Sequence, residues 1–135
     1  MAFISWNEKY SVEIQSIDNQ HLVLVEIIND LHEAMKAGKS KEILGSTLDR
    51  LVKYTNTHFS DEEKLMTSAA YPQLPSHKIE HSRFVSKLND FQKNFDNGST
   101  LLSIDLLNFL KDWLLNHITV TDKQYSPLMK QKGIK

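Results

Sequence analysis

A chain of 135 residues is long enough for one domain with a buried core and short for two, so we expect a single domain over residues 1–135. The formal net charge of -1 provides no basic field, which argues against nucleic acid or an anionic membrane surface as a partner. The absence of cysteine excludes disulfides, iron–sulfur clusters and thiolate zinc sites, and leaves histidine and carboxylate as the strong metal ligands.

No segment approaches the roughly 18 apolar residues of a membrane span, and the N-terminus lacks the pattern of a secretory signal. We therefore expect a cytoplasmic protein. Residues 1–17 are predicted to form an arm that packs across the rest of the molecule, because their apolar side chains have no helical period: Phe3, Ile4, Trp6 and Tyr10.

Residues 18–135 contain four segments with helical periodicity. The first is predicted from Asp18, as N-cap, to Ala37, with Gly38 as its stop. The second should run from Ser40 to Met66, with a stripe at one-face spacing: Leu44, Leu48, Leu51, Thr55, His58, Glu62 and Leu65. The third should start near Pro75 or Ser76, with the stripe His77, His81, Phe84, Leu88, Phe91 and Phe95. The fourth has Leu107, Leu110, Leu114 and His117. Short connections predict an all-α, up-down-up-down four-helix bundle with an N-terminal arm.

Five of the six histidines lie on these helices at positions that converge. A single buried histidine is usually a core residue with satisfied nitrogens. In an antiparallel bundle, however, the start of the first and third helices and the end of the second and fourth share one end of the molecule. That end would collect His21, His58, His77, His81 and His117. His32 lies about 16 Å further along the first helix, so we expect it to have a packing or capping role.

Two carboxylates complete this cluster. Glu62 follows His58 at i+4, the spacing of a pair that can converge on one metal or on two neighbouring metals. Asp122 follows His117 by five residues, about 140° round a regular helix, so it reaches the site only if the backbone leaves α geometry. The alternative is that Asp122 is a solvated charge beyond the end of the helix.

Counting ligands suggests what the site binds. Two octahedral metals have about twelve coordination positions, and five histidines, two bridging carboxylates and one bridging oxide or hydroxide fill all but one. A single open position with neutral nitrogen donors suits reversible binding of one small ligand. A metal-free interaction bundle would leave five buried imidazoles unexplained.

The pentapeptide "HKIEH" at residues 77–81 also matches the inverted zinc-protease motif H-x-x-E-H, in which a glutamate activates water. Such a protease needs a further acidic ligand and a peptide cleft, whereas the chain after His81 is mostly one bundle helix. We therefore interpret Glu80 as a helix charge at the edge of the buried stripe.

The segments "IDNQH", "HFSDEE", "HKIEH" and "DWLLNHITVTD", in this order, resemble the hemerythrin family, and in particular its bacterial single-domain members. The resemblance implies two iron ions (Fe²⁺/Fe³⁺) with an oxo or hydroxo bridge. It implies that His77, His81 and His117 bind one iron, that His21 and His58 bind the other, and that Glu62 and Asp122 bridge them. It also implies an oxygen pocket lined by Phe59, Trp113, Leu114 and Ile118. At Thr121 the family often has a larger apolar residue.

The function implied by the resemblance is reversible O₂ binding for storage, transport or buffering, with O₂ taken up at the iron that has fewer histidines. We expect a monomer that is not an enzyme. One alternative is a di-iron oxidoreductase acting on peroxide or nitric oxide, but ferritin-like carboxylate sites use mainly glutamate with two histidines, unlike this set. Another alternative is an oxygen-sensing module, and such modules are usually fused to a signalling domain.

Overall fold

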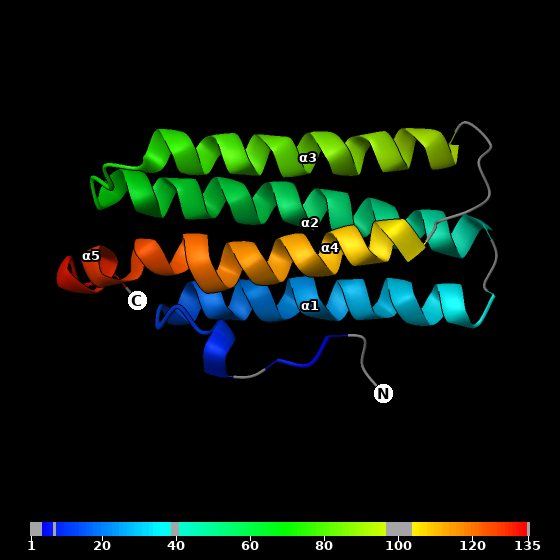
Figure 1. Ribbon diagram of the computed structural model, residues 1–135, viewed down its shortest axis with the longest axis horizontal. Coiled ribbons are helices and arrows are strands. Elements are labelled where there is room, and N and C mark those ends of the chain that lie inside the picture. Colours follow the sequence, from blue (N-terminus) through cyan, green and yellow to red (C-terminus); the bar gives the residue numbers. More distant parts are fainter. Residues whose placement is uncertain (1–3, 7, 39–40, 97–103, 135) are drawn as a thin grey trace.

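The computed structural model describes residues 4–6, 8–38, 41–96 and 104–134, and four long antiparallel helices make up most of it (Figure 1). These helices are α1 (Gln15–Lys36), α2 (Lys41–Ser68), α3 (Leu74–Asp96) and α4 (Ile104–Asn116). Shorter elements are the 3₁₀ turn η1 (Glu8–Tyr10), the π-helical turn η2 (His117–Thr121), the 3₁₀ turn η3 (Asp122–Gln124) and α5 (Ser126–Gln131). The predicted all-α up-down-up-down bundle is confirmed, whereas α5 was not predicted.

The start of α1 differs from the prediction. The helix begins at Gln15, and Ile14 occupies the N-cap position without a side-chain cap. Asp18 is therefore not the N-cap; its carboxylate instead accepts hydrogen bonds from the Val12 amide (2.9 Å) and the Ser11 hydroxyl (2.6 Å). The end of the helix is close to the expected one, because Gly38 follows with a φ of +66°, which glycine adopts without strain.

The N-terminal arm packs along α1 as expected (Figure 1). Ile4 is buried, its amide donates to Asn29 Oδ1 at 2.8 Å, and Asn29 Nδ2 donates back to the Ile4 carbonyl at 2.9 Å. Tyr10 is buried as well, with the half-buried Trp6 against it. Phe3 and Ser40, two residues named in the sequence predictions, lie outside the described residues.

Two apolar clusters fill the molecule. The main core extends between the four long helices and includes most of the predicted stripe residues, although Leu44, Leu65 and Phe91 are only half-buried. A second group, here called the end cluster, closes one end of the bundle and consists of Val12, Ile14, Ile17, Met66, Ala69, Tyr71, Tyr125 and Met129. None of the described helices combines the length and hydrophobicity that a bilayer crossing requires.

Candidate metal centre

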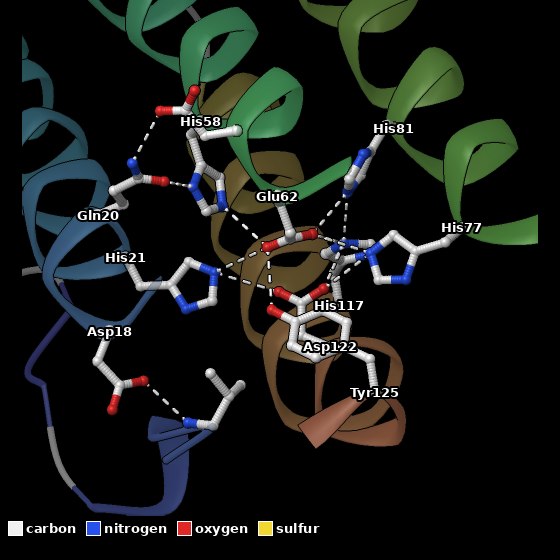
Figure 2. A network of polar contacts seen from close by, with 12 residues as sticks. Asp18, Gln20, His21, His58, Glu62, His77, His81, His117, Asp122 and Tyr125 are labelled. Atoms are coloured by element: carbon white, nitrogen blue, oxygen red, sulfur yellow. Dashed lines mark hydrogen bonds and ion pairs between the residues drawn. The ribbon is translucent and has the colours of Figure 1, made fainter. Parts of the chain in front are cut away.

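Seven polar side chains that the sequence predicts to converge do lie together (Figure 2). Each is at most 3% exposed. They come from the start of α1, the end of α2, the start of α3, and the turns η2 and η3: His21, His58, Glu62, His77, His81, His117 and Asp122. The antiparallel topology thus brings residues distant in sequence to one buried place.

Glu62 lies between two groups of imidazoles. Its Oε1 is 3.0 Å from the Nε2 atoms of both His77 and His81. Its Oε2 faces the other way, 3.3 Å from His58 Nε2 and 3.6 Å from His21 Nε2. One carboxylate therefore presents one oxygen to each group.

Asp122 also lies between two groups of imidazoles, with one oxygen facing each group. Its Oδ1 is 3.0 Å from His77 Nε2 and 2.9 Å from His117 Nε2, whereas its Oδ2 is 3.1 Å from His21 Nε2. The two carboxylates together define a three-histidine group (His77, His81, His117) and a two-histidine group (His21, His58). Both groups have atoms close enough to surround a metal ion.

The π-helical turn η2 is what brings Asp122 into the site. The Asp122 amide donates to the His117 carbonyl, five residues earlier, so the turn is wider than an α-helical turn. The predicted departure from α geometry between His117 and Asp122 is confirmed. Asp122 has 0% exposure, so the alternative of a solvated charge is wrong.

The donor atoms of this cluster fit cations. Among the described residues, several fully buried atoms have no hydrogen-bond partner: both nitrogens of His21, Nδ1 of His77, and both oxygens of Asp122. Buried carboxylates and imidazoles without partners are costly, and metal coordination is one way to satisfy them. Nitrogen and carboxylate donors without sulfur suit iron in a non-heme site. Two groups that share two carboxylates suit a pair of metal ions.

Without metal, the two carboxylates hold protons on neighbouring imidazoles. Burial disfavours the charged form of His21, but the carboxylates of Asp122 and Glu62, 3.1 Å and 3.6 Å from its Nε2, outweigh burial and raise the pKa of His21 to about 9. The same balance raises the pKa of His77 to about 9. Burial lowers the pKa of His58. Burial also opposes ionisation of Glu62, yet the imidazoles around it hold its pKa well below the usual range. Metal ions must displace the imidazole protons in order to bind.

Three imidazoles also have a side-chain partner for Nδ1, on the side away from the carboxylates. The pairs are His58–Gln20 (2.6 Å), His81–Glu63 (2.8 Å) and His117–Glu80 (3.2 Å). Sequence reasoning missed Gln20 and Glu63, and it interpreted Glu80 only as a helix charge. Their places in the sequence could have indicated Gln20 and Glu63, because each is the immediate neighbour of a predicted ligand, His21 and Glu62 respectively.

Tyr125 is a further residue that the sequence did not indicate. Its hydroxyl donates to Glu62 Oε2 at 3.1 Å, and its ring has 0% exposure in the end cluster. Figure 2 shows this contact, which joins the carboxylate to the end cluster that contains Tyr125.

The residues predicted to line an oxygen pocket are buried or half-buried beside the cluster. Phe59 stacks on His81, with ring centroids 3.8 Å apart, and Trp113 stacks on His117 at 4.3 Å. Leu114 and Ile118 belong to the main core. His32, at 24% exposure, is not part of the cluster, as expected from its distance along α1.

Comparison with known proteins identifies the family. The model of the Hemerythrin HHE cation binding domain matches residues 12–129. The chain belongs to the hemerythrin family. The matched segment contains all five histidines and both carboxylates of the cluster.

Individual relatives agree over nearly the whole chain. Bacteriohemerythrin of Methylococcus capsulatus is 35% identical over 130 residues, which cover 96% of this chain and 98% of that protein. Myohemerythrin of Theromyzon tessulatum is 34% identical over 120 residues, 89% of this chain and 88% of that protein. A crystal structure of wild-type hemerythrin superimposes with a TM-score of 0.90 at 32% identity, covering 95% of this chain and 98% of that one.

Proposed function

We propose that this protein binds O₂ reversibly at a non-heme di-iron centre and serves in oxygen storage, transport or buffering. One observation supports this proposal most directly. Glu62 and Asp122 both lie between the two groups of imidazoles, and each carboxylate presents one oxygen to each group. The chain also belongs to a family whose relatives are named hemerythrins.

The proposed ligand set follows the two groups. His77, His81 and His117 would hold one iron, His21 and His58 would hold the other, and Glu62 and Asp122 would each offer one oxygen to each iron. All five Nε2 atoms approach a carboxylate oxygen, which supports ligation through Nε2. This set leaves one position open, on the iron with two histidines.

The protein fixes the positions of the imidazole and carboxylate donors and excludes water from them, since each is at most 3% exposed. Two irons, when bound, supply the electrons that reversible O₂ binding requires. Tyr125 donates to Glu62 and restrains one bridging carboxylate. Phe59 of the main core stacks on His81, and Tyr125 of the end cluster donates to Glu62. We propose that Phe59, Trp113, Leu114 and Ile118 form the apolar wall of the oxygen pocket. Exclusion of water and anions protects the bound state from irreversible oxidation.

The test is an absorption spectrum of the iron-loaded protein with and without O₂, combined with metal analysis. We expect two irons per chain and a visible charge-transfer band that appears with O₂ and bleaches when O₂ is removed. One zinc per chain, or no iron after anaerobic loading with ferrous iron, would contradict the di-iron centre. Consumption of peroxide or nitric oxide with turnover would instead favour the oxidoreductase alternative.

A cytoplasmic location, a monomeric state and the lack of an enzymatic reaction remain predictions. Fractionation of the source cells and sedimentation of the purified protein test the first two. The third requires that O₂ is recovered unchanged after repeated cycles of loading and release.

A further inference from the structure

The Nδ1 partners of the two histidine groups differ in charge. In the three-histidine group, His81 and His117 face carboxylates, Glu63 at 2.8 Å and Glu80 at 3.2 Å. In the two-histidine group, the corresponding partner is an amide, because Nδ1 of His58 faces Gln20 Oε1 at 2.6 Å. Among the described residues, carboxylates contact Nδ1 directly in the three-histidine group, whereas a neutral amide contacts it in the two-histidine group.

The side-chain amide of Gln20 is held so that its oxygen, and not its nitrogen, faces Nδ1 of His58. Its Nε2 donates to Asp61 Oδ2 at 3.0 Å, so its oxygen is left to face His58. Asp61, on α2 like His58, therefore fixes the orientation of the neutral Gln20 side chain.

Glu80 is held in place as well. Its Oε1 accepts a hydrogen bond from the Thr121 hydroxyl at 3.1 Å and lies 3.2 Å from His117 Nδ1. The same oxygen therefore connects α3 to the π turn η2 and to the imidazole that begins this turn. This contact gives a role to the glutamate of "HKIEH" and joins it to Thr121 as well as to His117.

A carboxylate that accepts the N–H of a metal-bound imidazole makes the ring a stronger donor and fixes its orientation. Stronger donation, together with the negative charge, favours the more oxidised metal. We infer that Glu63 and Glu80 are positioning residues that act through His81 and His117 to stabilise the ferric state of the three-histidine iron, while Gln20 leaves the other iron without this bias. The inference rests on the di-iron ligand set proposed above.

The experiment compares Glu63→Gln and Glu80→Gln with wild type in the iron-loaded protein, by redox titration. Glutamine keeps an acceptor oxygen for the imidazole but removes the charge. We expect one of the two one-electron steps to move about tenfold towards ferrous iron, an increase in potential of about 59 mV. The shift should be larger for Glu63, because its contact is shorter and its side chain is 26% exposed against 42% for Glu80.

Asp112→Asn is the control, because it removes an equal charge from an exposed position on α4. A potential change in both glutamine variants no larger than in this control would overturn the inference. As a second readout, proton NMR of the ferrous protein should show one iron-shifted imidazole N–H resonance displaced in each glutamine variant and none in the control. Unmoved resonances would also overturn it.

Failure of the inference is distinguishable from failure of the proposed function. If wild type and variants all bind two irons and O₂ but share the same potentials, only the role of Glu63 and Glu80 is wrong. If wild type does not bind two irons, the ligand set is wrong, and this inference is overturned with it. The two variants lie on different helices, so a folding defect in one leaves the other as the test.

Discussion

Glu62 is the residue on which both metal subsites depend, because its two oxygens face different groups of imidazoles. Glu62→Gln replaces one of the two carboxylate oxygens that we propose to bridge the irons with an amide nitrogen, and it removes a buried charge. We expect iron binding to weaken by at least about tenfold at both subsites. Iron per chain, measured after dialysis against a competing chelator, should therefore fall well below two.

Substitutions on α1 provide matched comparisons for this loss. His32→Ala, at a half-buried position outside the cluster, should leave iron content and the oxygen spectrum unchanged. His21→Ala, on the same helix, should lower iron content. Loss of iron in His32→Ala would mean that the proposed ligand set is wrong.

The pKa shifts in the cluster predict how the metal-free protein responds to pH. His21 and His77 have folded-state pKa values of about 9, above the ordinary value of 6.5. Their protonation stabilises the fold fully below about pH 6.5, and this contribution is lost as the pH rises through 9. Thermal unfolding of the metal-free protein should therefore show a Tm that falls between pH 6.5 and 9.5.

Below neutral pH, the buried carboxylate of Glu62 makes stability fall as the pH falls. The pKa of Glu62 is held well below its ordinary value of 4.5, so its contribution to stability is present above about pH 4.5 and is lost as the pH falls.

The iron-loaded protein is the control for the predicted fall in Tm between pH 6.5 and 9.5. Iron replaces the imidazole protons, so this alkaline loss of Tm should disappear. A Tm of the metal-free protein that stays constant from pH 6.5 to 9.5 would contradict the prediction.

At the scale of single elements, the buried face of α4 packs in the main core, and we propose that its end near His117 also protects the metal centre. Leu114 is 3% exposed and lies one turn before His117. Leu114→Ala should cost about 2–5 kcal/mol of stability through the cavity it leaves. If Leu114 also lines the oxygen pocket, the variant should convert from the oxygenated to the ferric form faster than wild type, as measured by decay of the oxygen-dependent band.

Leu107→Ala is the matched control on the same helix, because Leu107 is 2% exposed and lies two turns further from His117. It should lose comparable stability at an unchanged rate of oxidation. Equal oxidation rates in wild type and both variants would show that Leu114 has a packing role alone.

The four long helices and the position of the site were predictable because apolar periodicity and antiparallel topology determine both. The ligand spacing also predicted that the backbone leaves α geometry after His117. The sequence could not show that Asp18 serves the arm rather than the helix start, since the same residue type favours both roles. The contacts of Glu63 and Glu80 depend on side-chain rotamers and on neighbouring helices, which have no short-range sequence pattern.

For the molecule as a whole, the metal centre connects two apolar regions that are otherwise separate. The main core stabilises the long helices, whereas the end cluster joins residues 12–17, the end of α2 and α5. Tyr125 belongs to the end cluster and donates to Glu62, so we expect the end cluster to lose order when the site loses its metal.

Removal of iron should therefore lower the Tm and loosen the two ends of the bundle unequally. Metal binding is coupled to folding, and each kcal/mol of lost stability lowers the Tm of a domain of this size by about 4 °C. Hydrogen exchange should increase first in residues 117–131 and 12–17, while amides near Leu31 and Leu48, both at 0% exposure in the main core, remain protected. Uniform loss of protection along the bundle would contradict a local coupling, because it would mean that the metal centre stabilises both cores equally.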